Sequence, residues 1–247
     1  MRLFGLTGYP LGHSWSEEYF RNKFLNENLT ECVYQNFPAG DINEIRQIIK
    51  RHPDLEGLNV TIPHKINILS VLDEIDPEAI EIGAVNCISI KKKAGQLILS
   101  GFNTDAPAFL ESLKPELRSG QQKALVLGTG GSSRAVCHAL RKLQTEFLVV
   151  SRNAETGHLT YQDLDVRIIS SHNIIINTTP LGMWPEISTL PPIPYHLITA
   201  DHLLYDLVYN PKETIFLKKG KEMGAMVKNG LEMLKLQAEM SWKIWNH

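Results

Sequence analysis

Short apolar runs alternate with amphipathic segments along the first hundred residues of the chain. Apolar-rich runs that end at Gly or Pro are typical of strands, and apolar residues three and four apart are typical of helices. The pattern predicts strands at Arg2–Thr7, Cys32–Phe37 and Gly57–Thr61, and helices at Ser16–Asn28 and Ile42–Lys50. Ser14 or Ser16 can cap the first helix. This alternation favours an α/β fold with a mostly parallel sheet.

The next segment departs from this alternation. Two apolar runs, Ala84–Ile90 and Gln96–Leu99, are separated only by the polar turn Lys91–Gly95, which is typical of an antiparallel strand pair. The stretch Thr104–Leu117 is predicted to be a helix that holds Pro107 in its first turn. We expect a domain boundary here, with residues 1–102 forming the first domain.

The second half of the chain, residues 103–230, again alternates strands and helices. The predicted strands are Leu125–Leu127, Phe147–Val150, Ile174–Asn177, Leu203–Leu207 and Ala225–Lys228. Short apolar runs with long connections indicate a doubly wound parallel sheet. The proline-rich segment Gly182–Pro194 lacks periodicity and is expected to be a long loop. The last helix is predicted at Leu231–Trp245.

The composition narrows the class of protein. The 247 residues are 43% hydrophobic, enough for packed cores, and the formal net charge of -2 lacks the basic surplus of a nucleic-acid-binding protein. The widely spaced Cys32, Cys87 and Cys137 favour reduced thiols over a disulfide framework or a zinc site. The N-terminus does not resemble a signal peptide, and no apolar run is long enough to span a membrane. A soluble, cytoplasmic protein is therefore expected.

The segment Lys123–Val136, KALVLGTGGSSRAV, carries the most informative motif. An apolar run ends at Gly128, Gly130 follows, and a helix-compatible stretch begins at Ser132. In this context one glycine permits a tight turn, the next lets the backbone approach a pyrophosphate, and the helix N-terminus holds the phosphate charge. Ser133 stands where the pattern has a third glycine. The alternative is an ordinary tight turn in a parallel sheet.

The cofactor type follows from the residues after the second strand of this domain. An acidic residue there accepts a hydrogen bond from the 2′-hydroxyl of NAD. The sequence is Ser151-Arg152-Asn153, with an arginine and no acid. A guanidinium suits a 2′-phosphate, so the sequence predicts NADP(H), with Arg134 as a second candidate cation. The alternative is that Arg152 is a solvated residue after a strand.

Eight short motifs in register along the chain resemble those of the shikimate dehydrogenase family. They are HSWS at 13–16, NVTIPHK at 59–65, GAVNCI at 83–88, GFNTD at 101–105, GTGGSSR at 128–134, NTTPLGM at 177–183, DLVYNP at 206–211 and NGLEMLKLQA at 229–238. The resemblance implies the reversible NADP-linked reduction of 3-dehydroshikimate to shikimate, a step of chorismate and aromatic amino acid biosynthesis. It also implies a Rossmann-like domain at 103–230 and a C-terminal helix, 231–247, that packs back on the first domain.

The resemblance assigns the acid–base chemistry to Lys65 and Asp105. Hydride delivery to a ketone builds negative charge on its oxygen, so the site needs a proton donor there. Lys65 follows Pro63 at a predicted strand end, and Asp105 lies at a predicted helix start. The family match makes Lys65 exchange the proton, while Asp105 orients it or shares that role. Taken alone, Lys65 would be a surface lysine and Asp105 part of an N-cap cluster.

Substrate contacts also come from the family match, because an acid with several hydroxyl groups needs partners from several segments. Ser14 and Ser16 are expected to bind the carboxylate, and Tyr209 to close that end. The ring hydroxyl groups are expected to contact Thr61, Asn86, Asp105 and Gln237. Without the match, the two serines would be a capping pair, Asn86 a turn residue and Gln237 a solvent-facing residue.

The residues expected to contact NADP(H) come from the glycine turn, the arginine turn and two later loops. They are Gly128, Gly130, Gly131, Ser132, Ser151, Arg152, Thr178, Met183 and Gly230. Met183 is expected to lie against the nicotinamide, and core packing is the alternative for its side chain. No metal is expected, because His13 and His64 lack the spacing of metal ligands.

The chain departs from the family pattern at several positions. The family usually has Pro directly after S-x-S and His-Asn slightly later, where this chain has Glu17, Phe20 and Arg21. A second phosphate-binding cation is missing after Arg152, where Thr156 stands. This absence softens the expected preference for NADP.

Two other functions stay open from the sequence. One is a broader quinate/shikimate dehydrogenase that uses NAD, and the other is a catalytically silent module that senses the ligand or the nucleotide. The presence of both Lys65 and Asp105 argues against the silent module, which has no need of them. The expected partners are the small-molecule substrate and cofactor, with no nucleic acid or membrane, in a monomer or homodimer.

Overall fold

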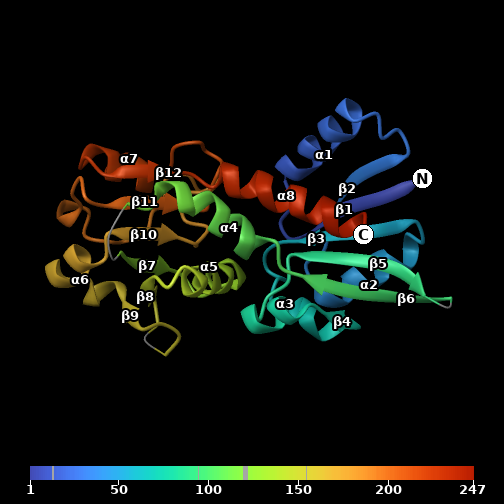
Figure 1. Cartoon of the computed structure of the whole chain (residues 1–247), viewed down its shortest axis with the longest axis horizontal. Coiled ribbons are helices and arrows are strands. Elements are labelled where there is room, and N and C mark those ends of the chain that lie inside the picture. Colours follow the sequence, from blue (N-terminus) through green and yellow to red (C-terminus); the bar gives the residue numbers. More distant parts are fainter. Residues whose placement is uncertain (13, 94, 119–121, 154) are drawn as a thin grey trace. The chain divides into compact units, whose positions relative to one another are not determined.

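The computed structural model describes residues 1–12, 14–93, 95–118, 122–153 and 155–247, so the motif residue His13 lies outside the described residues. The chain divides into two compact units (Figure 1). The first unit comprises Met1–Thr104 together with Ala238–His247, and the second comprises Asp105–Gln237. One division thus lies close to the expected boundary, and the other falls inside the last helix.

The first unit is built on a mixed sheet. Its strands are β1 (Arg2–Gly8), β2 (Cys32–Pro38), β3 (Leu55–Val60), β4 (Glu74–Ile75), β5 (Cys87–Lys93) and β6 (Gln96–Phe102). They lie in the order β2-β1-β3-β5-β6-β4. β1 pairs in parallel with β2 and β3, whereas β5 runs antiparallel to both β3 and β6. The predicted antiparallel pair is therefore confirmed, but β5 begins and ends three residues later than predicted and includes Lys91–Lys93 of the predicted turn, and β6 continues three residues further.

Helices cover both faces of this sheet. They are α1 (Trp15–Asn26), α2 (Ile42–Arg51), the short α3 (Pro77–Ile82) and the C-terminal part of α8 (Leu231–Trp245). Leu3 and Phe4 are neighbours in β1 and therefore point to opposite faces. Leu3 belongs to the apolar cluster that holds Ile45 of α2, and Phe4 belongs to the cluster that holds Phe20 of α1 and Trp245 of α8.

The end of α8 is fixed to this sheet by Trp245. Its ring stacks on Phe4 with centroids 5.0 Å apart, and its indole Nε1 donates a hydrogen bond to the carbonyl of Ile88 at 3.0 Å. A Cβ on Gly57 would overlap this indole, so glycine makes room for it. The expected return of the last helix to the first domain is confirmed.

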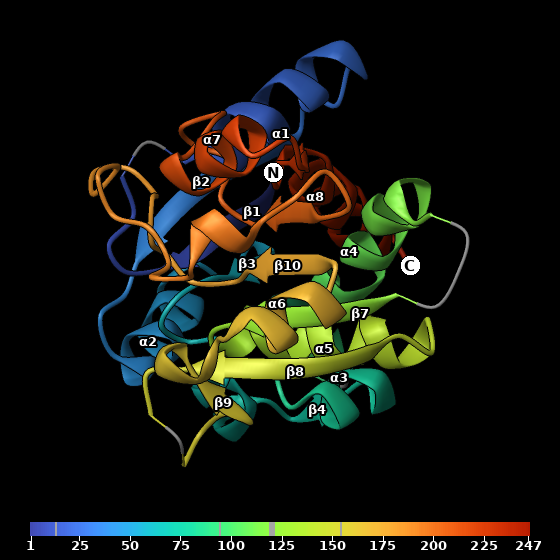
Figure 2. The same ribbon diagram turned by 90° about the vertical axis from the view of Figure 1, so that its left-hand side faces the viewer.

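The second unit contains a parallel sheet. Its strands are β7 (Lys123–Leu127), β8 (Glu146–Ser151), β9 (Leu159–Thr160), β10 (Ile174–Asn177), β11 (Leu203–Asp206) and β12 (Met226–Lys228). Every described pairing is parallel, in the order β12-β11-β10-β7-β8-β9, and Figure 2 shows β10, β7 and β8 in succession. This is the strand order of the Rossmann fold. The order reverses between β7 and β10, where such sheets bind ligands beyond the carboxyl ends of their strands.

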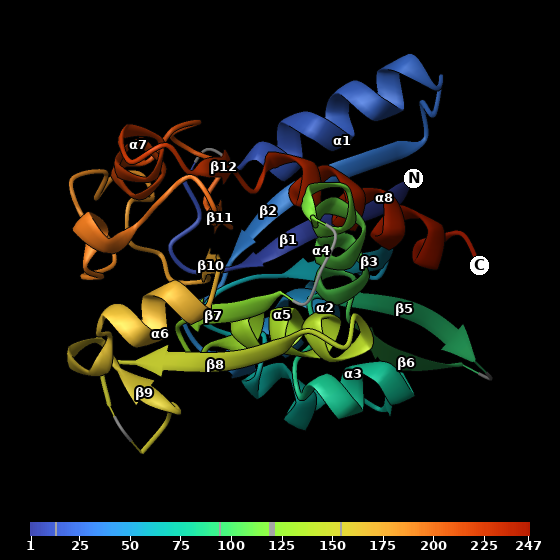
Figure 3. The same cartoon turned by 60° about the vertical axis from the view of Figure 1, so that its left-hand side comes forward.

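Helices pack on both faces of this sheet as well. They are α4 (Asp105–Leu113), α5 (Gly131–Lys142), α6 (Val166–Ser171) and α7 (Ile215–Glu222). Leu204 of β11 lies against Gly220 of α7, whereas the next residue, Tyr205, contacts Phe109 of α4 at a centroid distance of 5.1 Å. Because neighbouring residues of a strand point to opposite faces, α4 and α7 cover opposite sides of β11. α5 packs against α4, β7 and β8 (Figure 3).

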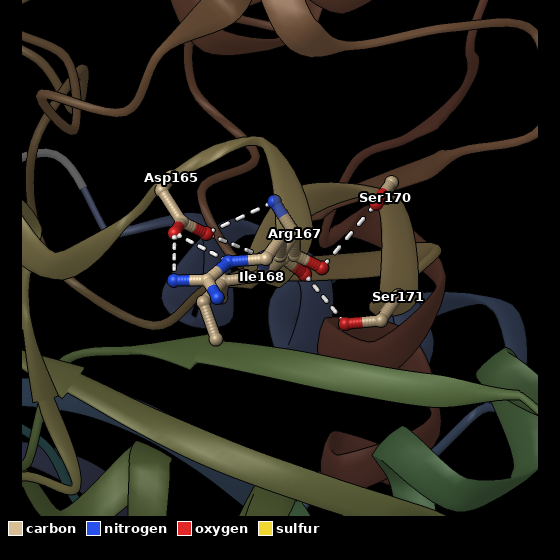
Figure 4. Close-up of polar contacts among 5 residues, drawn as sticks. All are labelled: Asp165, Arg167, Ile168, Ser170 and Ser171. Atoms are coloured by element: carbon tan, nitrogen blue, oxygen red, sulfur yellow. Dashed lines mark hydrogen bonds and ion pairs between the residues drawn. The ribbon is translucent and has the colours of Figure 1, made fainter.

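The hydrophobic pattern does not predict the short elements α3, β4, β9, α6 and α7, because too few turns or residues show a period. Asp165 is the N-cap residue of α6, and its carboxylate accepts hydrogen bonds from the backbone N–H groups of Arg167 and Ile168, each at 2.9 Å (Figure 4). The bond from Ile168 lowers the pKa of this carboxyl group. Side-chain capping therefore starts a helix that periodicity does not reveal.

The predicted helix at Thr104–Leu117 is shorter in the structure. It ends as an α-helix at Leu113 and continues as a 3-10 turn over Lys114–Glu116. Pro115 explains the change, since it has no N–H for an α-helical hydrogen bond. None of the helices in the described part of the chain has the length and apolar character needed to span a bilayer.

Candidate active site

The turn after β7 requires glycine at its first position. Gly128 has φ +111°, in the left-handed region that side chains disfavour. A Cβ at this position would lie 2.8 Å from Oγ1 of Thr178, the residue that follows β10. The Thr178 hydroxyl in turn donates a hydrogen bond to the carbonyl of Leu127 at 2.7 Å. Gly128 and Thr178 therefore lie side by side where the strand order reverses.

The helix after this turn begins without a side-chain cap. Gly130 is the N-cap residue of α5, and its first turn contains Gly131 and Ser132. A Cβ added to Gly130 would meet no atom of the described residues within 4 Å, so there is open space beside this residue. Ser133, at the third position of the motif, donates a hydrogen bond to the carbonyl of Gly128 at 2.7 Å and ties the helix to the turn. This open, N–H-lined surface fits a pyrophosphate.

The turn after β8 presents an arginine and no acidic residue. Ser151 is buried, and its hydroxyl accepts a hydrogen bond from the N–H of Asn153 at 3.2 Å and lies 2.8 Å from the Thr156 hydroxyl. Arg152 is exposed, and its charge opposes the rise that burial causes in the pKa of Tyr161. The backbone is thus held by Ser151 while a cation faces solvent, an arrangement that suits a 2′-phosphate.

The glycine and arginine turns together are the residues that would hold NADP(H). The first offers an uncapped helix N-terminus with room for phosphates, and the second offers a guanidinium where an NAD-specific site has a carboxylate. Both features belong to the second unit. The donor set therefore fits the dinucleotide that the sequence predicts.

Three further cofactor and substrate candidates lie on later segments of the second unit. Met183 is half-buried, and its N–H donates a hydrogen bond to the carbonyl of Pro180 at 3.0 Å. Gly230 is needed for packing, because a Cβ there would overlap the carbonyl of Leu207. Burial raises the pKa of Tyr209. Their roles toward ligands stay predictions.

The two serines near the N-terminus have different local partners. Ser14 is the N-cap residue of α1, and its Oγ accepts a hydrogen bond from the N–H of Glu17 at 3.4 Å. Ser16 lies inside the first turn, is buried, and its hydroxyl bonds to the hydroxyl of Tyr34. The capping role expected for Ser14 or Ser16 therefore falls to Ser14.

The departures from the family pattern in α1 have clear structural roles. The Glu17 carboxylate accepts a hydrogen bond from the side-chain amide of Asn36 at 2.5 Å. Phe20 is fully buried and stacks on Tyr34 with ring centroids 4.5 Å apart. Glu17 thus ties α1 to β2, and Phe20 joins the core of the first unit.

Asn86 fixes the segment that leads to Asp105. Its side-chain amide donates a hydrogen bond to the Thr104 hydroxyl at 2.9 Å, and its Oδ1 accepts one from the Thr104 N–H at 2.6 Å. Asp105 follows directly and is the first residue of α4. Asn86 therefore acts as more than a turn residue, because both ends of its amide set the backbone immediately before the predicted catalytic carboxylate.

A buried chain of hydrogen bonds continues from this point and was not indicated by the sequence. The Tyr34 hydroxyl donates to Oδ1 of Asn59 at 3.0 Å, and the Asn59 amide donates to Ser241 at 2.8 Å. The Ser241 hydroxyl lies 3.3 Å from that of Thr104. These residues come from β2, β3, α8 and the segment before α4, so only tertiary structure brings them together. The one available signal was that Asn59 opens the NVTIPHK motif.

The segment that carries Lys65 is fixed by backbone hydrogen bonds. The N–H of Thr61 donates to the carbonyl of Thr7 at 2.9 Å, and the carbonyl of Lys65 accepts from the N–H of Val85 at 2.8 Å. Lys65 is half-buried. Lys65 belongs to the first unit and Asp105 to the second, so each is placed by its own unit. Their catalytic roles stay predictions.

Two other residues in this region need comment. Gln237 is buried, with 8% of its surface exposed, which disfavours the solvent-facing alternative, and its amide donates a hydrogen bond to the carbonyl of Leu234 at 2.9 Å. The Nε2 of the buried His64 lies 2.7 Å from the carbonyl of Ala39, a structural contact. Among the described residues, no group of His, Cys, Asp and Glu side chains could hold a metal ion.

Comparison with known proteins places these features in a family. Residues 6–88 match the model of the shikimate dehydrogenase substrate binding domain. The chain is 38% identical over 264 residues to a shikimate dehydrogenase (NADP(+)) of Methanococcus maripaludis strain C7, covering 99% of this chain and 91% of that protein.

Solved structures agree with this match. The shikimate 5-dehydrogenase of Thermus thermophilus in complex with NADP(H) and shikimate superimposes with a TM-score of 0.83 and 34% identity, covering 99% of this chain and 93% of that one. The enzyme of Listeria monocytogenes in complex with shikimate and NAD gives a TM-score of 0.81 and 28% identity, covering 100% and 92% of the two chains.

Proposed function

The chain belongs to the shikimate dehydrogenase family, and we infer that it catalyses the reversible NADPH-dependent reduction of 3-dehydroshikimate to shikimate. One observation carries this conclusion: 38% identity to an NADP-dependent shikimate dehydrogenase extends over 99% of the chain. The glycine turn and the exposed Arg152 support it independently, since both suit a dinucleotide with a 2′-phosphate.

In this proposal the second unit binds the cofactor, which when bound supplies a hydride to the substrate carbonyl carbon. The N–H groups at the start of α5 hold the pyrophosphate, and Gly130 leaves room for its approach. Arg152 binds the 2′-phosphate, with Ser151 fixing the turn beneath it. Thr178 and Met183 lie on the loop that follows β10, on the nicotinamide side of the point where the strand order reverses.

Lys65 and Asp105 handle the proton. As the carbonyl oxygen gains negative charge, the Lys65 ammonium donates a proton to it. This protonation gives the hydroxyl group of shikimate. In the reverse direction Lys65 takes this proton from the alcohol. Asp105 holds the ammonium or the reacting hydroxyl in place, and Asn86 supports it by fixing Thr104, the residue directly before it.

Polar residues from separate segments hold the rest of the substrate. Ser14 is well suited to the carboxylate, because its oxygen already accepts a hydrogen bond from Glu17 and its proton is still there to donate. Ser16 and Tyr209 complete this end. The ring hydroxyl groups are assigned to Thr61, Asn86, Asp105 and Gln237. The expected assembly is a monomer or a homodimer.

Steady-state absorbance at the nicotinamide band tests the function directly. The full chain is mixed with shikimate or quinate and with NADP+ or NAD+, in all four combinations. Turnover fastest with shikimate and NADP+ is expected. Faster turnover with NAD+ would overturn the cofactor assignment, faster turnover with quinate would overturn the substrate, and binding without turnover would indicate a ligand-sensing module.

A further inference from the structure

Two buried polar residues end neighbouring strands of the second unit and share one hydrogen bond. Asn177 is the last residue of β10 and Asp206 the last of β11, and they are register partners. Both side chains belong to fully buried residues. The strands lie on the β10–β12 half of the sheet, the half that holds the second mononucleotide of a dinucleotide in this fold.

The Asp206 carboxylate is used as an acceptor by three segments. Oδ1 accepts from the Asn177 amide at 2.9 Å and from the N–H of Val208 at 3.0 Å. Oδ2 accepts from the Thr214 hydroxyl at 2.6 Å. These donors belong to the last residue of β10, the loop after β11 and the N-cap of α7. One carboxylate therefore joins both loops at the carboxyl end of the sheet.

The orientation of Asn177 follows from its partners. Its amide nitrogen donates to Asp206 and to the carbonyl of Leu181 at 3.3 Å, while its Oδ1 accepts from the hydroxyl of Thr179 at 2.6 Å and from the N–H of Thr179 at 3.1 Å. The Asn177 nitrogen faces Asp206 only if residue 206 offers a hydrogen-bond acceptor. Asp206 thus fixes the orientation of the Asn177 amide, and this amide in turn bonds to Thr179 and Leu181 in the loop Thr178–Met183.

The second loop is fixed by the same carboxylate. The hydrogen bond from the Val208 N–H to Asp206 fixes the backbone directly before Tyr209. Thr214, the N-cap residue of α7, bonds to the same carboxylate at the other end of the loop. The two loops also touch, since a Cβ on Gly182 would lie 3.3 Å from Cβ of Thr214. Any displacement of Asp206 would therefore move both loops.

We propose that Asp206 is a positioning residue for the nicotinamide half of the cofactor, acting through Asn177 and Thr214 on the loops that carry Met183 and Tyr209. This inference rests on the proposed function. Burying an ionisable group costs free energy, so a carboxylate at this position is not explained by packing alone. Burial raises the pKa of Asp206 to about 6, a sign of that cost.

Equilibrium binding of NADP+ and of 2′,5′-ADP to the full chain tests the proposal, because 2′,5′-ADP lacks the nicotinamide half. Asp206→Ala should weaken NADP+ binding by roughly 10- to 100-fold, the scale of an ångström-sized misplacement, and leave 2′,5′-ADP binding unchanged. Thr214→Val keeps the shape of the side chain but removes both the hydroxyl donor to Asp206 and the oxygen that accepts from the Leu217 N–H at the start of α7. It should show a smaller loss in the same direction. This milder variant decides the question should Asp206→Ala fail to fold.

Two variants separate positioning from general loosening of the core. Asp206→Asn keeps an acceptor oxygen for Asn177 and Val208 and should restore NADP+ affinity to within about threefold of the wild type. Ser112→Ala removes another buried hydrogen bond of this unit, the one at 2.7 Å to the Tyr205 hydroxyl, and should change neither affinity.

The possible failures are distinct. Equal losses of NADP+ and 2′,5′-ADP affinity, or unchanged NADP+ affinity in both Asp206→Ala and Thr214→Val, would overturn the positioning role alone. Absence of NADP+ binding by the wild-type chain would overturn the proposed function and this inference with it.

Discussion

The Oγ of Ser14 accepts a hydrogen bond from the backbone N–H of Glu17 at 3.4 Å, so the helix cap uses the oxygen of this serine and not its proton. The hydroxyl proton is thereby left for a substrate carboxylate. One side chain can serve the helix and the ligand together, and substitutions can separate the two roles.

Ser14→Asp is expected to preserve stability and impair substrate binding. Asp caps helices about as well as Ser, so the free energy of unfolding should change by less than about 0.5 kcal/mol, whereas Ser14→Ala should cost about 1 kcal/mol. The new negative charge should raise the KM for shikimate at least tenfold, since like charges in a binding site are strongly unfavourable, with the KM for NADP+ unchanged. Urea denaturation and steady-state kinetics measure both effects, and an unchanged KM for shikimate would remove Ser14 from the site.

Lys65→Met should lower kcat by about 10²- to 10⁴-fold, the usual loss on removing an acid–base group. KM for shikimate should change little, because the proton transfer is completed only in the transition state. Lys50→Met is the matched control, as this lysine is exposed at the end of α2. Near-wild-type turnover of the Lys65 variant would exclude it from the mechanism.

Alanine substitutions at the two glycines before α5 should have different effects, one on stability and the other on cofactor binding. Gly128→Ala forces a side chain into φ +111° and against Thr178, so it should lower the free energy of unfolding by about 1–3 kcal/mol. Gly130→Ala meets open space at φ -76°, so stability should fall by less than about 1 kcal/mol. In the proposed binding mode its methyl group would lie where the pyrophosphate approaches, so NADP+ affinity should drop about tenfold or more. Thermal unfolding and calorimetric titration compare the two, and full NADP+ affinity in Gly130→Ala would contradict the assigned binding mode.

Arg152→Ala should raise the KM for NADP+ and spare that for NAD+. Hydrogen bonds to a charged group contribute about 1.5–3 kcal/mol, which corresponds to roughly 10- to 150-fold in KM. Arg167→Ala serves as the control, because this arginine is exposed and pairs only locally with Asp165 among the described contacts. Equal effects of Arg152→Ala on both cofactors would reject its role at the 2′-phosphate.

The buried Asp206 predicts a pH dependence of stability. Its pKa is raised to about 6 in the folded protein from 3.8, so between these values the folded state binds more protons than the unfolded state. The free energy of unfolding should therefore fall as pH rises through this window, by about 3 kcal/mol in all, with no further change from this group above about pH 7.

Asp206→Asn isolates this effect, because other carboxylates contribute equally in both proteins. The stability of the wild type relative to Asp206→Asn should decline from pH 4 to pH 6 and then level off, as measured by urea denaturation at each pH. Parallel stability curves across this range would show that Asp206 titrates normally.

The sequence determined most of the longer local elements and the family of this protein. The spacing of apolar residues and the positions of glycine and proline predict the bounds of β10 and α8 to within a residue. These signals depend only on residues near one another in the sequence. The glycine turn is equally local, since the φ of Gly128 and the uncapped start of α5 depend on adjacent residues. The order of the motifs then identified the family without any knowledge of contacts.

Only the tertiary structure decided how distant polar residues support one another. The pairing of Asn177 with Asp206 joins positions 29 residues apart, and that of Asn59 with Ser241 joins positions 182 apart. The periodicity of apolar residues does not predict such pairs, because strand register and helix packing bring the two partners together. Motifs therefore predict candidate ligand-binding residues, and the fold supplies the buried hydrogen bonds around them.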